Sequence, residues 1–402
     1  MTTPDGVLIT DFDHHSSTFA ADPFAVLDEL RAQAPVAWST AYGGFWVVTG
    51  HEPAVDGLAG YQSFTSTTGP AIPAGPFGTR HIPVSLDPPE HGLYRRVLNK
   101  WYSKSEIERL EPTIKAMIEH IVKDLAERGH WDFVEDLGNV SPGAVTLGLL
   151  GWESDMRVEL LRVMARGLAN QTSQDPAVIA ENQRGNSWIR EEILARAYDR
   201  QANPRDDLMS ALVTTEFEPG RVMTDEEISD TVVFLLLAGF HTTSGAFASL
   251  MVHLARHPED RERLEADRSL IPGAIEEIVR IYSPVTSLAR SATEDTELGG
   301  VPVCEGDRVL FVTMGANQDA GAFENPREVE LGRKATRSVG FGWGVHRCLG
   351  LHLARTLLRL EVEAVFDLLP GYRIDLDGVR LSTAMGVGYF YDSVPASLTG
   401  QA

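Results

Sequence analysis

The residues of this chain that could do chemistry lie in a glycine-rich run with one cysteine, Phe341-Gly342-Trp343-Gly344-Val345-His346-Arg347-Cys348-Leu349-Gly350. Its three glycines let the backbone turn tightly, so that N–H groups can point at the cysteine sulfur. Apolar residues recur at helical spacing from Cys348 to Asp367, which predicts a helix that starts at the cysteine. The positive end of its dipole, together with the turn, favours a Cys348 thiolate, and a thiolate is a metal ligand.

The run resembles the haem-binding signature of the cytochrome P-450 family, F-G-x-G-x-[HR]-x-C-x-G, at every fixed position. The resemblance implies that Cys348 is the axial ligand of haem iron and that Phe341, Gly342, His346 and Gly350 lie against the haem. A thiolate in this position pushes electron density onto iron and favours O–O bond cleavage. For the run alone, a buried free cysteine beside a glycine turn is the alternative. A dinucleotide fingerprint is excluded, because the third glycine and the preceding strand are missing.

A second group of candidate residues lies in a long apolar segment, Ala238-Gly239-Phe240-His241-Thr242-Thr243. A glycine inside a helix costs roughly 1 kcal/mol relative to alanine, so Gly239 indicates close approach by another group. The resemblance implies that haem and dioxygen approach the turn formed by Ala238 and Gly239. It also implies that Thr242 hydrogen-bonds dioxygen and helps to deliver protons. The alternative for Thr242 is a hydrogen bond back to the carbonyl oxygen of Ala238.

The residue before this threonine departs from the family pattern, because His241 stands where the family ordinarily has Asp or Glu. Histidine can relay protons near neutral pH, so we predict that His241 and Thr242 manage protons together. The stretch around His241 is similar to that of the sterol 14α-demethylase branch. We interpret this similarity as a shared solution to proton delivery and not as evidence for a sterol substrate.

Two haem carboxylates buried in an apolar pocket would need cationic or hydrogen-bonding partners. The segment Asp87-Pro88-Pro89-Glu90-His91-Gly92-Leu93-Tyr94-Arg95 resembles the family segment that binds a propionate, which nominates His91 and Arg95. Arg290 matches another propionate arginine, and His346 is the fourth candidate. Each residue taken alone could instead be an ordinary surface charge.

Glu277 and Arg280 lie three residues apart in a helix predicted from about Pro272 to Tyr282, so they share a face and can pair. Such a pair is commonly a surface ion pair. The resemblance implies instead a buried ion-pair core completed by Arg333, with the structural role of holding the cysteine loop, which is the run of residues 341–350 that carries Cys348.

The composition is that of a globular protein of 402 residues, with 43% hydrophobic and 23% charged residues. The resemblance implies a mainly α fold with small peripheral β-sheets, one cytochrome P-450 domain over residues 1–402, and haem between the oxygen-binding helix and the cysteine helix. The longest apolar stretch, Val232 to Phe240, is half of what a membrane helix needs, and the N-terminus carries neither a basic nor an apolar region. We therefore expect no membrane anchor and a cytoplasmic location. Cys304 and Cys348 suit a reducing compartment, and Cys304 is predicted to be a plain buried thiol.

The formal net charge of -22 disfavours nucleic acid and anionic lipid as partners. Against this background, basic residues gather in two clusters. They make either a docking surface for a small acidic electron carrier or a set of solvated faces and haem contacts. The clusters are Arg95, Arg96 and Lys100, and Arg347, Arg355 and Arg359.

The function implied by the resemblance is that of a monooxygenase with haem b (iron protoporphyrin IX), which uses dioxygen to oxidise a hydrophobic small molecule. The sequence contains no flavin or iron–sulfur motif, so electrons would come from a ferredoxin and an NAD(P)H-dependent ferredoxin reductase. Because His241 is unusual, peroxide-driven or atypical redox chemistry, such as nitration or coupling, stays open. A haem-binding sensor or carrier without catalysis is the alternative from another class.

Overall fold

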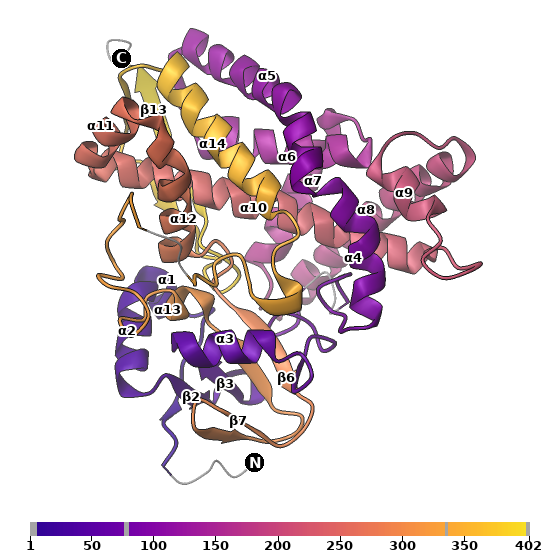
Figure 1. The fold of residues 1–402 in the computed structure, drawn as a ribbon, viewed down its shortest axis with the longest axis vertical. Helices are drawn as coiled ribbons and strands as arrows, with labels where there is room; N and C mark the ends of the chain where they lie inside the picture. Colours follow the sequence, from indigo (N-terminus) through magenta and orange to yellow (C-terminus); the bar gives the residue numbers. More distant parts are fainter. Residues whose placement is uncertain (1–5, 76–79, 334–336, 399–402) are drawn as a thin grey trace.

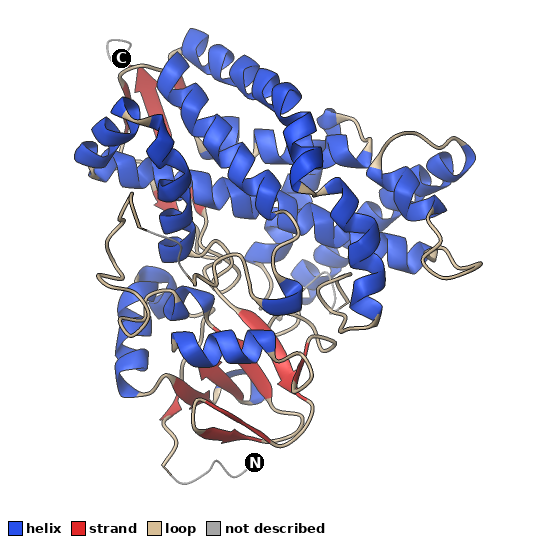
Figure 2. Cartoon of the chain, viewed as in Figure 1, coloured by secondary structure: helices blue, strands red, loops and turns tan. Residues whose placement is uncertain are grey.

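The computed structural model describes residues 6–75, 80–333 and 337–398, and it is mainly helical with small sheets, as predicted (Figure 2). Most strands lie together at the end of the molecule that carries the N-terminus, and helices form the rest (Figure 1). The helices are α1 Ser17–Ala21, α2 Pro23–Gln33, α3 His51–Ala59, α4 Glu90–Trp101, α5 Lys104–Arg128, α6 Val140–Leu150, α7 Arg157–Ala169, α8 Pro176–Ala202, α9 Leu208–Thr214, α10 Asp225–Arg256, α11 Pro258–Ala266, α12 Ile271–Tyr282, α13 Thr313–Ala316 and α14 Leu351–Leu368. The strands are β1 Ile9–Thr10, β2 Val36–Ser39, β3 Phe45–Val48, β4 Phe64–Thr65, β5 His130–Asp132, β6 Leu288–Ala292, β7 Thr296–Leu298, β8 Val301–Val303, β9 Arg308–Phe311, β10 Tyr372–Ile374, β11 Arg380–Leu381, β12 Tyr391–Ser393 and β13 Pro395–Leu398.

The largest sheet within the described residues has the strand order β1-β2-β3-β9-β6-β4. Its β2 and β3 pair antiparallel, with Trp38 opposite Trp46, which confirms the strand pair predicted there. Helix α3 lies against this sheet, and Phe311 of β9 fills the space beside Gly57 of α3, where a Cβ atom would come within 2.2 Å of the ring. The sheet thereby holds β6, which carries Arg290.

Helix α10 is the central helix of the helical part (Figure 1). It begins with a capping box, in which Thr224 Oγ1 accepts from the Glu227 N–H and Glu227 Oε2 accepts from the Thr224 N–H. Within the described residues, α10 alone is long and apolar enough to cross a membrane, but 67% of its most apolar window is buried in the protein. We therefore interpret α10 as a core helix, packed against α6, α8, α12 and α14.

Helix α14 begins at Leu351, so the prediction that a helix starts at Cys348 is wrong by three residues. The reason is the loop that carries the cysteine. Arg347 is extended, with φ −48° and ψ 139°, and the Cys348 N–H turns back to donate to Phe341 O at 2.8 Å. Gly342 and Gly344 have φ of +70° and +65°, which side-chain-bearing residues rarely adopt. Gly350 has an ordinary φ of −80°.

Cys304 is exposed, so the prediction of a buried thiol is also wrong. It follows Val303, the buried last residue of β8, at the start of a turn. Its N–H donates to Asp307 Oδ2 at 3.1 Å, which closes that turn and leaves the side chain facing outward.

Candidate active site

A cavity lies between α10 and the cysteine loop with α14, and its volume is about 230 Å³. On the same measure, one water molecule needs only ~10–15 Å³. Most lining side chains are apolar, and they come from α4, α10, α12, β6, α14 and the cysteine loop. Eleven of the predicted site residues border it: His91, Arg95, Ala238, Gly239, Thr242, Arg290, Phe341, Gly342, His346, Cys348 and Gly350.

Cys348 borders this cavity and is half-buried. The Gly350 N–H donates to its sulfur, and Arg95 lies close enough to act on its charge; both interactions lower the pKa of the thiol. Burial acts more strongly, and it holds the pKa of the Cys348 thiol above its usual value. The Gly350 N–H thus favours the thiolate in the sense expected from the sequence, and burial opposes it. A bound metal ion would displace the proton.

At one edge of the cavity, the buried side chains of Arg290 and His91 each have a nitrogen atom without a hydrogen-bond partner among the described residues. Arg290 is 1% exposed, and its Nη1 donates to Ala289 O at 2.7 Å while Nη2 has no hydrogen-bond partner among the described residues. Burial lowers its pKa to about 10. His91 Nε2 also lacks a partner in this part of the chain, and burial lowers the pKa of His91 to about 4. Buried donors of this kind fit an anion that comes from outside the chain.

His346 and Arg95 join this edge. The rings of His346 and His91 lie 4.5 Å apart, and His346 Nε2 is 3.0 Å from Ser66 Oγ. Arg95 Nη1 donates to Arg347 O at 3.1 Å, which ties α4 to the cysteine loop. The four side chains therefore converge from α4, β6 and the cysteine loop, as two carboxylates of one haem would require, and the residues present fit that group.

Two further residues at this site were missed by the sequence analysis. Asp87 Oδ1 accepts from the Ser66 N–H at 3.1 Å and lies 3.9 Å from His346 Nε2, so it positions the imidazole edge. Tyr102 also borders the cavity. Burial raises the pKa of Tyr102, and the charge of Cys348 raises it further. Asp87 could have been found, because it opens the segment that nominated His91.

The opposite wall is the middle of α10. Thr242 Oγ1 donates to Ala238 O at 2.7 Å, which is the alternative that the sequence left open for this hydroxyl. A Cβ atom at Gly239 would lie 2.5 Å from Thr146 Oγ1 of α6. Thr146 is therefore one group that approaches Gly239 closely, and the approach of haem and dioxygen to Gly239 stays a prediction.

His241 does not border the cavity. Its ring lies 6.0 Å from that of Phe390, and its Nε2 has no partner among the described residues. Burial lowers the pKa of His241 to about 4, so the imidazole is neutral at neutral pH. Its part in proton delivery stays a prediction.

The three residues of the expected ion-pair core lie together. Arg280 donates to Glu277 through Nε at 2.8 Å and Nη2 at 2.9 Å, and Arg333 Nε donates to Glu277 Oε2 at 2.9 Å. Arg280 Nη1 also donates to Asn317 O at 2.9 Å, and Asn317 Oδ1 accepts from the Val339 N–H at 2.9 Å. This chain of contacts links α12 to the segment that leads into the cysteine loop.

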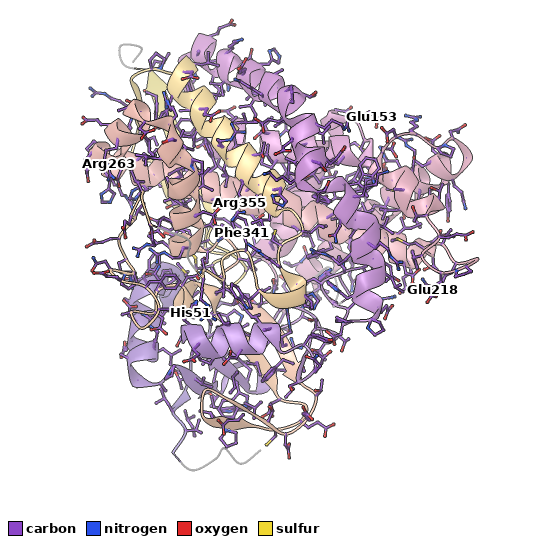
Figure 3. All side chains as sticks on the ribbon, in the orientation of Figure 1. His51, Glu153, Glu218, Arg263, Phe341 and Arg355 are labelled. Atoms are coloured by element: carbon purple, nitrogen blue, oxygen red, sulfur yellow. The ribbon has the colours of Figure 1, made fainter. Side chains whose placement is uncertain are left out.

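The two basic clusters are partly neutralised. Arg355 pairs with Glu276 at 2.6 Å, and Arg359 pairs with Glu111 at 2.7 Å. Arg355 also lies over the Phe341 ring, 5.4 Å from its centroid, beside the start of α14 (Figure 3). The exposed cations that have no ion-pair partner in the described part of these clusters are Arg96, Lys100 and Arg347.

Known proteins resemble this chain in both sequence and fold. The family model for cytochrome P450 matches residues 182–367. A steroid C26-monooxygenase of Mycobacterium tuberculosis is 31% identical over 87% of this chain and 92% of that protein, and a pentalenic acid synthase of Streptomyces avermitilis is 30% identical over 88% of each chain. The solved structure of cytochrome P450 CREJ with (4-ethylphenyl) dihydrogen phosphate has a TM-score of 0.87, 28% identity, and coverage of 98% of this chain and 99% of that one. The family signature at Cys348, the fold and these relatives together show that this chain belongs to the cytochrome P450 family of monooxygenases.

Proposed function

We propose that the chain binds haem b through Cys348 and inserts one atom of dioxygen into a hydrophobic small molecule. The observation that carries this proposal is the cavity itself, with Cys348 on one wall, Thr242 on the other, and unpartnered nitrogens of Arg290 and His91 at its edge. When bound, the haem supplies an iron centre that reduces dioxygen and cleaves its O–O bond. We propose that residues 6–398, as far as they are described, act as a single catalytic domain.

Four side chains would hold the two haem carboxylates. Arg290 and Arg95 supply positive charge, and His91 and His346 supply imidazole N–H groups; burial lowers the pKa of His346 to about 3, so it donates as a neutral ring. The Gly350 N–H would hold the Cys348 sulfur in place by a hydrogen bond. The apolar lining of the remaining cavity would exclude water from the reacting atoms.

Protons would be handled on α10. The Thr242 hydroxyl holds a proton that it now donates to Ala238 O, and rotation about χ1 would present the same proton to the cavity. His241 is neutral, so it would relay a proton by accepting at one ring nitrogen and donating from the other. In this scheme Thr242 acts at the cavity and His241 acts behind it.

The substrate class follows from the lining. Val84, Phe234, Ala238, Val285 and Leu288 present apolar surface, which suits a hydrophobic molecule. Relatives of this chain are named for the oxidation of a steroid and for the synthesis of pentalenic acid. We propose a substrate with a similarly apolar carbon skeleton.

Electrons would come from a ferredoxin that is reduced by an NAD(P)H-dependent reductase in the cytoplasm. Arg96, Lys100 and Arg347 are exposed beside the cysteine loop, and they would attract a small acidic protein to a chain whose net charge is -22. The Arg95 contact to Arg347 O places the two groups of cations on neighbouring segments.

The experiment is NAD(P)H consumption with a surrogate ferredoxin and reductase, followed with and without candidate substrates. A monooxygenase consumes NAD(P)H and forms oxidised product. Product formed from peroxide alone, with no need for NAD(P)H, would contradict the electron route. Haem binding without any product would indicate a sensor or carrier instead.

A further inference from the structure

Arg308, the first residue of β9, is a half-buried cation that the site described above does not use. Among the described residues it makes no ion pair, and burial lowers the pKa of its guanidinium without an acidic neighbour to offset the effect. Burying a charge is costly unless its polar groups are hydrogen-bonded. The hydrogen bonds of Arg308 therefore have to compensate for its burial.

These hydrogen bonds hold one short segment, residues 68–71. Nη1 donates to Thr68 O at 3.2 Å and also contacts Thr68 Oγ1. Nη2 donates to Gly69 O at 3.1 Å and to Ala71 O at 3.0 Å. Three carbonyl oxygens of the segment thus accept from a single planar guanidinium, a geometry that a lysine ammonium does not reproduce.

Arg308 does not reach the cavity itself. In the pairing of β6 with β9, Ser291 lies opposite Arg308, and Arg290 lies opposite Val309. Successive residues of a strand point to opposite faces of the sheet, so the side chains of Arg290 and Arg308 lie on different faces. Arg290 borders the cavity and Arg308 does not, although the charge of Arg308 still acts on Arg290. Any geometric effect of Arg308 on the cavity therefore passes through residues 68–71.

The segment continues into a turn that contacts the cavity edge. The Gly69 N–H donates to Ser66 O at 3.0 Å, and Gly69 has a φ of +90°, which closes the turn. Ser66 is 0% exposed, and its Oγ lies 3.0 Å from Nε2 of His346. The turn thereby links the residues that Arg308 holds to the imidazole of His346.

The same segment also contacts the strand beside Arg290. Pro70 O accepts from the Ala289 N–H at 2.8 Å. Ala289 in turn accepts, through its carbonyl oxygen, the hydrogen bond of Arg290 Nη1 at 2.7 Å. The segment therefore lies next to two of the four groups proposed to hold the haem carboxylates.

We infer that Arg308 is a positioning residue for the haem. Its planar guanidinium holds residues 68–71, and through the turn at Ser66 it fixes the imidazole of His346 where that ring meets a haem carboxylate. The inference rests on the proposed function, because it concerns how the same site holds its haem.

The test compares the holoenzyme of Arg308→Lys with the wild type, because lysine keeps the charge and removes the planar fork. Solvent exchange of the Gly69 and Ala289 amide hydrogens should be roughly tenfold faster in the variant, and haem transfer to apomyoglobin roughly fivefold faster. Arg373→Lys, at an exposed arginine of β10, is the control and should change neither rate. Wild-type rates of amide exchange and haem loss in Arg308→Lys would overturn the inference.

Ser66→Ala locates the effect. It removes the hydroxyl beside His346 and should raise the rate of haem loss roughly fivefold. Because both substitutions act along one chain of contacts, the double variant with Arg308→Lys should lose haem at about the rate of the faster single variant. Effects that multiply, to about 25-fold, would overturn the inference.

Thermal melting checks that Arg308→Lys folds. If it does not, Thr68→Val, which removes one acceptor of Arg308, replaces it in the same comparison with Ser66→Ala. Haem loss at the wild-type rate in Ser66→Ala would overturn the inference without any variant of Arg308.

The inference and the proposed function fail separately. If Arg308→Lys speeds amide exchange and haem loss but the wild type forms no product with any electron source, the proposed oxidation fails and the role of Arg308 stands. If product forms while Arg308→Lys keeps the wild-type rates of amide exchange and haem loss, the proposed function stands and the role of Arg308 is refuted.

Discussion

The hydroxyl of Thr242 donates to the carbonyl oxygen of Ala238, one turn earlier in α10, at 2.7 Å. The bond holds a proton at the wall of the cavity that Cys348 faces. Because α10 is continuous through this turn, the bond is an addition to the hydrogen bonds of the helix backbone, and it fixes the side chain as well as storing the proton.

Thr242→Ala removes the proton and should uncouple electron use from oxidation. We expect the product formed per NAD(P)H consumed to fall by roughly tenfold or more, with released peroxide making up the difference. Thr242→Ser keeps the hydroxyl and serves as the control. Coupling that is unchanged in the alanine variant would remove Thr242 from the proton route.

The close approach of Thr146 to Gly239 predicts that a substitution at Thr146 restores the stability lost in Gly239→Ala. In Gly239→Ala, the new methyl group would lie 2.5 Å from Thr146 Oγ1, and overpacking of this kind costs about 1–3 kcal/mol of the free energy of unfolding. Adding Thr146→Ala leaves only the Cβ atom of residue 146, at 3.4 Å, which is an ordinary contact. Thermal melting should show a loss in the single Gly239 variant and recovery in the double variant. Equal loss in both would place the obstruction elsewhere.

These residues show what the sequence could predict and what it could not. The turn at Gly342 and Gly344, the mainly helical fold and the placement of Thr242 on α10 follow local patterns, and the structure has them. The start of α14 was misplaced because the Cys348 N–H bonds back to Phe341, a contact that apolar periodicity does not record.

Long-range packing accounts for the other differences. The partner of Gly239 is on α6, far away in sequence, and the burial of the Cys348 thiol depends on several elements. The pairing of Arg355 with Glu276 likewise joins α14 to α12, so the free cations of the basic clusters could not be identified from composition.

The two neighbouring glutamates Glu276 and Glu277 should contribute very differently to the free energy of unfolding. Glu277→Gln leaves Arg280 and Arg333 without their shared carboxylate, and breaking a buried pair costs about 3–5 kcal/mol of the free energy of unfolding. Glu276→Gln breaks only the half-exposed pair with Arg355, which should cost at most about 1 kcal/mol. Denaturant unfolding and haem content should both separate the two variants. Equal effects would mean that the buried core does not hold the cysteine loop.

The burial of Glu361 predicts how the free energy of unfolding changes with pH. It is 0% exposed, with Ser141 Oγ as its hydrogen-bond partner, and burial raises its pKa from 4.5 to about 8. Between these values the folded chain keeps a proton that the unfolded chain has lost. As pH rises from 4.5 to about 8, this group therefore lowers the free energy of unfolding by about 1.4 kcal/mol for each pH unit.

Glu361→Gln, which stays neutral, should melt higher than the wild type at pH 8, and the difference should shrink as pH falls toward 5. A difference that is constant across this range, or one that grows toward acid pH, would show that Glu361 is not a buried protonated acid.

The most direct test of the central claim, that Cys348 binds haem iron, is the absorption spectrum of the reduced protein with carbon monoxide. The wild type should show the band characteristic of a thiolate ligand, and Cys348→His should lose that band while the fold persists by circular dichroism. A wild-type spectrum without the thiolate band, or a thiolate band that remains in Cys348→His, would contradict the assignment.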